Sequence, residues 1–119
     1  MEKKLVLIFA VIVVVIVGVA IFLSPGGPEG GAYDGFAACL AEKKVVMYGA
    51  YSCPHCQNEK KRFGDSFRLV PYVECTEETE KCVAAGIEGY PTWIFGDGRR
   101  FEGEQGLQRL SQESGCLLP

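Results

Sequence analysis

The chain has 119 residues, of which 48% are hydrophobic, 15 are glycines, six are prolines and six are cysteines, and its formal net charge at pH 7 is −3. This length excludes a multidomain enzyme and any fold that needs about 200 residues or more, and it fits one small domain. The hydrophobic residues concentrate in a run from Leu5 to Leu23, where only Gly18 falls outside the hydrophobic set. Beyond this run the hydrophobic share is about 40%, which is ordinary for a soluble domain.

Residues 5–23 are predicted to be a transmembrane anchor, because a helix of about 19 residues spans about 28 Å, close to the thickness of the bilayer's hydrocarbon core. Lys3 and Lys4 precede the run, whereas no basic residue follows it directly. The positive-inside rule then places residues 1–4 in the cytoplasm. We expect a single-pass plasma (inner) membrane protein with a periplasmic or extracellular domain. The alternative is a cleaved signal peptide, since residues 18–20 weakly resemble a cleavage site.

The exported part divides into a Pro- and Gly-rich linker, residues 24–32, and a domain, residues 33–119. Its acidic residues outnumber its basic ones, so it lacks the basic surface of a nucleic-acid-binding protein and we expect no nucleic-acid partner. Six cysteines in so small a domain suit an exported location, where thiols can be oxidised and kept so.

The first half of the domain predicts a helix, a strand, a second helix and a second strand. Apolar residues at helical spacing predict a helix over Tyr33–Leu40. The short apolar run Val45–Ala50 predicts a buried strand. The polar stretch Cys56–Phe67 predicts a helix, with Cys56, Phe63 and Phe67 on one face. Leu69–Cys75 predicts the second strand.

A short third helix is expected next. Thr76 is a plausible N-cap for it, and Gly86 suits its C-terminal stop. The acidic stretch Glu74–Glu80 is interpreted as the solvated start of this helix, where carboxylates suit the positive end of the helix dipole.

The last part of the domain predicts a hairpin and a closing helix. The Asp-Gly pair at Asp97 favours a tight turn between strands Thr92–Phe95 and Arg99–Glu102. Trp93, inside the first of these strands, and Phe95 are expected to pack in the core. Glu104–Ser114 is predicted to form the final helix.

The Cys-Pro-His-Cys sequence lies where a predicted strand ends and a helix begins. Backbone N–H groups and the helix dipole at that junction stabilise a thiolate, which makes Cys53 the candidate nucleophile. Cys56 lies one helical turn further on, from where it can attack a mixed disulfide formed by Cys53. His55, the only histidine, can place positive charge or a donor beside the Cys53 sulfur. This stabilises the reduced dithiol and makes the disulfide more oxidising.

Two separated motifs, Cys-Pro-His-Cys and the later segment Gly86–Thr92, together resemble the thioredoxin superfamily. The resemblance implies an α/β fold with a central mixed sheet flanked by helices. It also implies a cis proline at Pro91, packed against the two cysteines, and a substrate-binding surface made by Tyr90, Pro91 and Tyr51. The family's buried acid, six residues before the first cysteine, is Met47 here, so the proton acceptor for the second cysteine is unidentified.

Within the superfamily, the Pro-His pair matches DsbA-type oxidants, but the chain has no room for the helical insertion of those proteins. The segments Tyr48–Gln57 and Pro71–Cys75 resemble the compact thioredoxin-like domain associated with bacterial vitamin K epoxide reductase homologues. Ser52 is a departure, because it replaces the usual aromatic residue beside the nucleophile.

The other four cysteines, Cys39, Cys75, Cys82 and Cys116, favour structural disulfides. A Cys75–Cys82 bridge would close a loop of about 8 residues, and a Cys39–Cys116 bridge would close about 78 and strap the termini of the domain. In one alternative, one of these pairs relays electrons to Cys53. In two others, Cys53 and Cys56 form an inert disulfide, or they hold zinc together with Cys75 and Cys82.

The expected function is that of a membrane-anchored thiol–disulfide oxidoreductase that forms disulfides in exported proteins. A quinone-linked membrane partner, such as a vitamin K epoxide reductase homologue, would re-oxidise its Cys53–Cys56 pair. No cofactor and no metal are expected. The alternatives are a disulfide reductase or isomerase and, from another class, a non-catalytic binding or chaperone module with the same fold.

Overall fold

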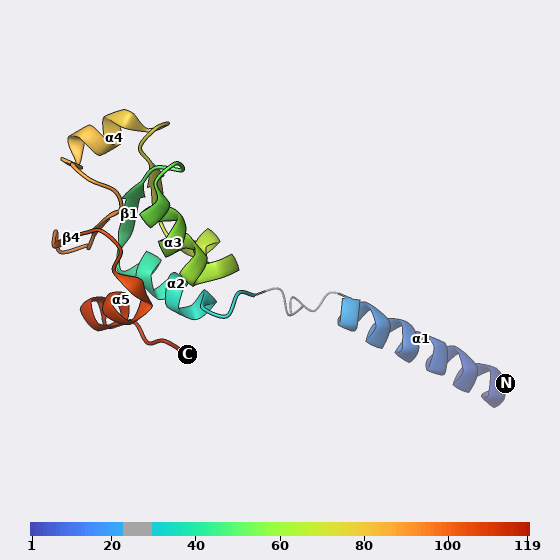
Figure 1. The fold of residues 1–119 in the computed structure, drawn as a ribbon. Coiled ribbons are helices and arrows are strands. Elements are labelled where there is room, and N and C mark those ends of the chain that lie inside the picture. The colour runs from blue at the N-terminus through green and yellow to red at the C-terminus, as the bar shows by residue number, and fades with distance from the viewer. Residues whose placement is uncertain (23–29) are drawn as a thin grey trace.

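The computed structural model describes residues 1–22 and 30–119, and Figure 1 shows its ribbon. Of the predicted linker, residues 24–32, the part up to position 29 lies outside the described residues, as does Leu23. The first helix, α1 (Glu2–Phe22), has a mean hydropathy of 2.7 within Glu2–Ala20 and is long enough to cross a bilayer. A signal sequence near an N-terminus meets the same criteria.

Four short strands of the described chain form one mixed sheet in the order β2-β1-β3-β4. β1 (Val46–Gly49) runs parallel to β2 (Tyr72–Glu74) on one side. On its other side β1 runs antiparallel to β3 (Thr92–Ile94), which in turn pairs antiparallel with β4 (Arg100–Glu102). This central mixed sheet with helices around it confirms the predicted α/β fold class.

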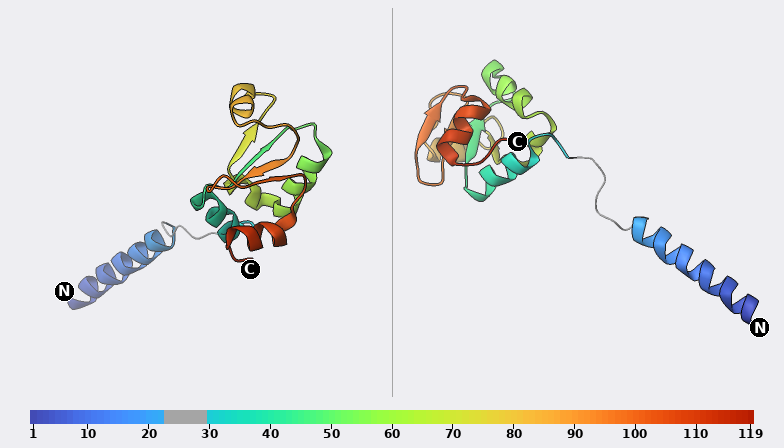
Figure 2. Two further views of the ribbon diagram at one scale, coloured as in Figure 1. Left: turned by 90° about the vertical axis from the view of Figure 1, so that its left-hand side faces the viewer. Right: turned by 90° about the horizontal axis from the view of Figure 1, so that it is seen from below.

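The helices of the domain follow the predicted order. They are α2 (Asp34–Glu42), α3 (Pro54–Phe63), the 3₁₀ helix η1 (Gly64–Leu69), α4 (Thr79–Ala84) and α5 (Gly106–Ser114). Figure 2 shows α4 and α5 at opposite ends of the sheet. The short α4 follows β2, whereas α3 and α5 contact each other. α5 is therefore joined to the helix that begins with the Cys-Pro-His-Cys sequence.

The helix predicted over Cys56–Phe67 is shorter than expected. It ends at Phe63 because Gly64 adopts a left-handed φ of 57°, which L side chains rarely adopt and which stops a helix. Phe67 therefore belongs to η1, but its ring still packs edge-on against Phe63, with 5.8 Å between the ring centroids. The predicted contact between Phe63 and Phe67 is therefore kept, although the α-helix ends between them.

The predicted N-cap at Thr76 is wrong. α4 begins at Thr79, with Glu78 in the cap position and no side-chain hydrogen bond there. The Thr76 hydroxyl instead donates to Glu74 Oε1 at 2.7 Å, back toward the end of β2. Gly86 has a φ of 67° and follows the C-cap residue Ala85, which confirms the predicted stop.

The hairpin and the final helix agree with the predictions to within two residues at their ends. β3 ends at Ile94, one residue earlier than predicted. Across the turn, Phe95 N donates to Arg99 O at 2.9 Å. Asp97 Oδ1 accepts a hydrogen bond of 3.0 Å from Arg99 N inside this turn. The final helix begins at Gly106 rather than Glu104, which leaves the Glu104 side chain free to reach α3.

The core fills the space between the sheet and helices α2, α3 and α5. Its largest buried aromatic side chains are in contact: the rings of Phe36 and Phe63 stack at 5.8 Å, and Phe63 lies 6.2 Å from Trp93. Trp93 and Phe95 are both buried, as predicted. Each such side chain contributes about 1.5–3 kcal/mol through burial, so this cluster fixes the position of α3 on the sheet.

Two disulfides brace the domain. Cys39 of α2 is bonded to Cys116, which follows α5, and Cys75 at the end of β2 is bonded to Cys82 of α4. Because Cys75 and Cys82 are bonded to each other, the structure does not bring them together with the remaining two cysteines as a four-thiolate zinc site.

Candidate active site

Cys53 occupies the N-cap position of α3, directly after β1 and its turn. Its Sγ accepts a hydrogen bond of 3.4 Å from the backbone N–H of Cys56, and Pro54 takes the first helical position, where no N–H is needed. Cys53 is a free thiol and is partly exposed. N–H groups at a helix N-terminus favour negative charge, so this position suits a thiolate nucleophile.

The loop that contains Pro91 lies against Cys53. The Tyr90–Pro91 peptide bond is cis, as the resemblance implies, and the Cys53 thiol donates to Tyr90 O across 3.6 Å. Pro91 itself is buried, and the hydroxyl of Thr92 anchors the loop by donating to Gly89 O at 2.7 Å. Two motifs 37 residues apart in sequence thus meet at one sulfur atom.

Cys56 is the second free thiol, and it is completely buried. Burial raises the pKa of the Cys56 thiol to about 12, and the neighbouring Cys53 acts in the same direction. Its sulfur sits against Gly49 of β1, where an added Cβ would lie only 2.8 Å from it. At neutral pH Cys56 is therefore a protonated thiol, and it must lose this proton before it can act as a nucleophile.

His55 takes a partner that the sequence did not reveal. Its Nδ1 lies 2.7 Å from Glu104 Oε1, and since a carboxylate can only accept, Nδ1 carries the hydrogen. Glu104 also accepts from Asn58 at 3.0 Å and from Arg62 at 2.9 Å. The hydrogen bonds from Asn58 and His55 lower the pKa of Glu104. The predicted role of His55 in tuning Cys53 stays a prediction.

Glu59 is a second residue that sequence reasoning missed. It is fully buried on α3 and accepts hydrogen bonds from the Trp93 indole and from the backbone N–H groups of Gln105 and Gly106. These bonds join α3 to β3 and to the start of α5. Glu59 also lies 3.9 Å from the guanidinium Nε of Arg62, three residues on. The hydrogen-bond partners of Glu59 and Glu104, however, lie between 34 and 49 residues away along the chain, so no local motif marks either residue.

Of the three predicted substrate-binding residues, Pro91 is buried, whereas Tyr51 and Tyr90 are exposed. Tyr51 precedes Cys53 by two residues and is 67% exposed, and Tyr90 is 43% exposed. The backbone oxygen of Tyr51 accepts a hydrogen bond of 2.8 Å from Gln57 on α3. Two exposed aromatic side chains therefore accompany the partly exposed sulfur.

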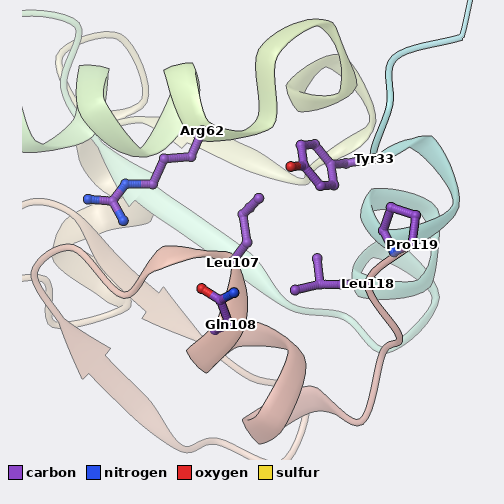
Figure 3. Close-up of a pocket in the computed structure, with 6 residues that line it drawn as sticks. All are labelled: Tyr33, Arg62, Leu107, Gln108, Leu118 and Pro119. Carbon is purple, nitrogen blue, oxygen red and sulfur yellow. The ribbon is translucent and has the colours of Figure 1, made fainter.

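A pocket of about 460 Å³ lies elsewhere, between the start of the domain, α3 and α5 (Figure 3). It is lined by Tyr33, Arg62, Leu107, Gln108, Leu118 and Pro119. Arg62 follows Cys53 by nine residues, which is about 13 Å along a helix. None of the predicted site residues lines this pocket, and it is separate from the candidate active site.

Comparisons with known proteins found similarity to a curated protein and to a solved structure. No protein-family model matches the chain. The thiol-disulfide oxidoreductase LTO1 of Arabidopsis thaliana is 38% identical over 81 residues, a match that covers 60% of this chain. The chain spans only 21% of the length of that relative. The X-ray structure of Fasciola hepatica thioredoxin is 21% identical, with a TM-score of 0.47, over 60% of this chain and 76% of its own.

The sequence match with LTO1 comes together with a mixed α/β sheet, a Cys-Pro-His-Cys sequence at the start of α3 and a cis proline beside it. These findings support the resemblance of the chain to the thioredoxin superfamily.

Proposed function

We propose that the chain is a thiol–disulfide oxidoreductase whose Cys53 and Cys56 alternate between a dithiol and a disulfide. The observation that carries this proposal is the contrast among the six cysteines. Four are paired as braces, whereas Cys53 is a partly exposed free thiol at a helix N-terminus, beside the cis Pro91. The similarity to a protein named as a thiol-disulfide oxidoreductase supports the same reaction class.

In the oxidising direction, the thiolate of a substrate attacks the Cys53 sulfur of the Cys53–Cys56 disulfide. A mixed disulfide forms, the Cys53–Cys56 bond breaks, and Cys56 leaves as a thiolate that takes up a proton. A second substrate thiolate then attacks the substrate sulfur of the mixed disulfide and releases Cys53 as a thiolate, which its N-cap position stabilises. Two electrons pass from the substrate dithiol to the enzyme disulfide. Reduction of a substrate is the same sequence in reverse.

The direction is proposed to be oxidation of exported proteins. The Pro-His pair between the two cysteines favours an oxidising couple, because a donor or positive charge near Cys53 stabilises the dithiol. On this basis His55→Ala is expected to shift the equilibrium with glutathione toward the Cys53–Cys56 disulfide. Two disulfides in one small domain are consistent with an oxidising compartment.

Substrate peptides are proposed to bind along the loop at Tyr90 and Pro91, with Tyr51 on the other side of Cys53. The exposed rings of Tyr51 and Tyr90 offer apolar contacts beside the reacting sulfur. α1 is proposed to anchor the domain in the membrane, where a quinone-linked partner resembling vitamin K epoxide reductase would re-oxidise the pair.

Two activity assays test the proposal with the full chain in detergent: reduction of insulin and oxidative refolding of a reduced substrate protein. We expect activity from the chain, none from Cys53→Ala, and nearly unchanged activity from the neighbouring control Ser52→Ala. Activity mainly in oxidative refolding supports an oxidant. Activity mainly in insulin reduction supports a reductase or isomerase. Full activity in Cys53→Ala would contradict the proposed role of Cys53, and no activity in the unaltered chain would support the non-catalytic binding module.

The substrates and the partner can be trapped in cells with Cys56→Ala, because this variant forms mixed disulfides that it cannot resolve. Adducts with many exported proteins would support an oxidant. Adducts with a single membrane protein would point to an electron relay instead.

A further inference from the structure

The buried thiol of Cys56 needs a partner that takes its proton, and Met47 offers none at the position where the superfamily has an acid. We propose that Tyr72 and Glu74 of β2 form the proton path between Cys56 and solvent, with Lys60 supplying positive charge. This inference rests on the proposed function, since it concerns the step in which Cys56 attacks or leaves.

The absent side chain of Gly49 brings the thiol and the phenol together. A Cβ added to Gly49 would lie 2.8 Å from Cys56 Sγ, 3.3 Å from Tyr72 Cε2 and 3.4 Å from the Tyr72 hydroxyl. Both polar groups therefore border the space that one methyl group would fill. Tyr72 reaches this space because β2 lies directly beside β1, with Tyr72 paired with Met47 and Glu74 paired with Gly49.

The hydroxyl of Tyr72 leads onward to a carboxylate. It donates to Glu74 Oε2 at 2.7 Å, while the hydroxyl of Thr76 donates to Oε1 at 2.7 Å. Partial burial acts to raise the pKa of Glu74, but the hydrogen bonds from Thr76 and Tyr72 outweigh it and lower that pKa. Glu74 is therefore an acceptor at neutral pH. It is only half-buried, next to the exposed Thr76, so it can exchange a proton with solvent.

Lys60 places a positive charge beside the same groups. It lies one turn after Cys56 on α3, and its Nζ is 3.9 Å from the centroid of the Tyr72 ring. Its charge lowers the pKa of Cys56, opposing the effect of burial and of Cys53. The titratable groups that act on Cys56 are thus Cys53 and Lys60. Tyr72 of β2 faces Cys56 in turn: burial, Glu74 and Cys56 all raise the pKa of Tyr72.

Glu59 is a fully buried acid of α3, but its carboxylate is already engaged in other hydrogen bonds. Its two carboxylate oxygens already accept three hydrogen bonds, from Trp93, Gln105 and Gly106. A neutral carboxylic acid would accept these hydrogen bonds inside the core more weakly than the carboxylate does. By contrast, the Tyr72 hydroxyl can accept from a thiol while it donates to Glu74.

The proposed step balances as follows in the direction that forms the enzyme disulfide. The Cys56 S–H proton passes to the Tyr72 oxygen while the Tyr72 proton passes to Glu74, so Tyr72 stays neutral. The Cys56 thiolate attacks the Cys53 sulfur of the mixed disulfide, the Cys53–Cys56 bond forms, and the other thiol leaves as a thiolate. Glu74 then releases its proton to solvent. In the opposite direction Glu74 returns a proton to the leaving Cys56.

The test is a rapid-mixing experiment on the full chain in detergent, with Cys53 and Cys56 reduced and oxidised glutathione as the probe. Acid quenching and mass measurement separate the first step, formation of the Cys53–glutathione adduct, from the second, in which Cys56 displaces glutathione. The variants are Tyr72→Phe, which keeps the ring below Lys60, and Glu74→Gln. Tyr48→Phe is the matched control, because alternation along β1 points Tyr48 to the opposite face from Gly49.

We expect Tyr72→Phe and Glu74→Gln to slow the second step by about 10-fold to 100-fold at neutral pH, as loss of a proton-transfer group does. The adduct should then accumulate, and the second step should recover as the pH rises and hydroxide replaces the lost acceptor. The first step and the Tyr48→Phe control should stay unchanged.

A second step at the wild-type rate in both variants would overturn the proton path while leaving the proposed function intact. An equal slowing of both steps would also overturn it, as a structural effect. A wild-type chain that forms no adduct would overturn the proposed function and this inference together.

Discussion

Trp93 and Glu59 hold each other in the core: the indole Nε1 donates to Glu59 Oε2 at 2.7 Å, and both side chains are completely buried. The same carboxylate accepts from two backbone N–H groups at the start of α5. A buried carboxylate is costly unless such donors surround it, and the donors are equally costly to leave unpaired. Glu59 therefore joins the sheet, the cysteine-bearing helix and α5 into one unit.

Replacing Glu59 should destabilise the domain strongly. Glu59→Ala leaves the Trp93 indole and two backbone N–H groups buried without a partner, and we expect the free energy of unfolding to fall by about 3–5 kcal/mol. Denaturant unfolding of the full chain in detergent measures this change. Glu42→Ala, at an exposed position of α2, is the control and should change stability by less than about 0.5 kcal/mol. Equal stability of the two variants would contradict the role given to Glu59.

A methyl group at Gly49 should displace the second cysteine. In Gly49→Ala the new Cβ would meet Cys56 Sγ at 2.8 Å, closer than real Cβ contacts, so the helix or the sulfur must shift. We expect the free energy of unfolding to fall by about 1–3 kcal/mol and disulfide exchange to slow. Gly35→Ala is the matched control, since nothing lies within 4 Å of its Cβ position. A wild-type exchange rate in Gly49→Ala would show that Cys56 does not need this close contact.

Acid should weaken the contact between α2 and η1. The two terminal guanidinium nitrogens of Arg68, Nη1 and Nη2, donate to the Asp34 carboxylate at 2.7 and 2.6 Å. These bonds lower the pKa of Asp34 from 3.8 to about 2. The folded state therefore binds this proton more weakly than the unfolded state. The contribution of the Asp34–Arg68 interaction to stability is therefore complete above about pH 4 and is lost as the pH falls toward 2.

Asp34→Asn provides the measurement, by denaturant unfolding of both proteins across this pH range. The stability difference between the wild type and Asp34→Asn should be largest near neutral pH and shrink on acidification. A difference that stays constant from neutral pH to about pH 2 would show that this ion pair has no part in acid stability.

The two structural disulfides should differ in their effect on stability. Cys39–Cys116 joins residues 77 apart, whereas Cys75–Cys82 joins residues 7 apart. In the chain-entropy model the longer loop restricts the unfolded chain more, and its loss should cost about 2 kcal/mol more than loss of the shorter one. Paired Cys→Ala variants of each bridge, compared by denaturant unfolding, measure the difference. A larger loss for the Cys75–Cys82 pair would contradict this ranking.

The element order could be predicted because each element carries its own local pattern. The apolar run of β1, the Asp-Gly turn at Asp97 and the stop at Gly86 all act within a few residues of themselves. The junction at Cys53 followed from the same reasoning. The cis bond before Pro91, whose neighbour Tyr90 contacts Cys53 from 37 residues along the chain, could be expected only from the family resemblance.

The missed features depend on contacts between distant segments. Glu59 receives hydrogen bonds from Trp93 of β3 and from the start of α5, and Glu104 receives one from His55 of α3. No window of sequence contains these contacts. Thr76 is not the N-cap of α4; its hydroxyl donates a hydrogen bond to the nearby Glu74 carboxylate instead. Glu74 itself was interpreted as part of a solvated acidic stretch, yet it is half-buried and bound to Tyr72.

The claim that Cys53 and Cys56 form the redox couple is tested most directly by equilibrating the full chain in glutathione buffers of graded ratio. Remaining thiols are then alkylated and located by mass. We expect only Cys53 and Cys56 to pass from dithiol to disulfide as the buffer becomes more oxidising, in one two-electron transition, while the Cys39–Cys116 and Cys75–Cys82 bridges stay closed throughout. Thiols at Cys53 and Cys56 that persist in the most oxidising buffer, or exchange confined to either brace, would contradict the claim.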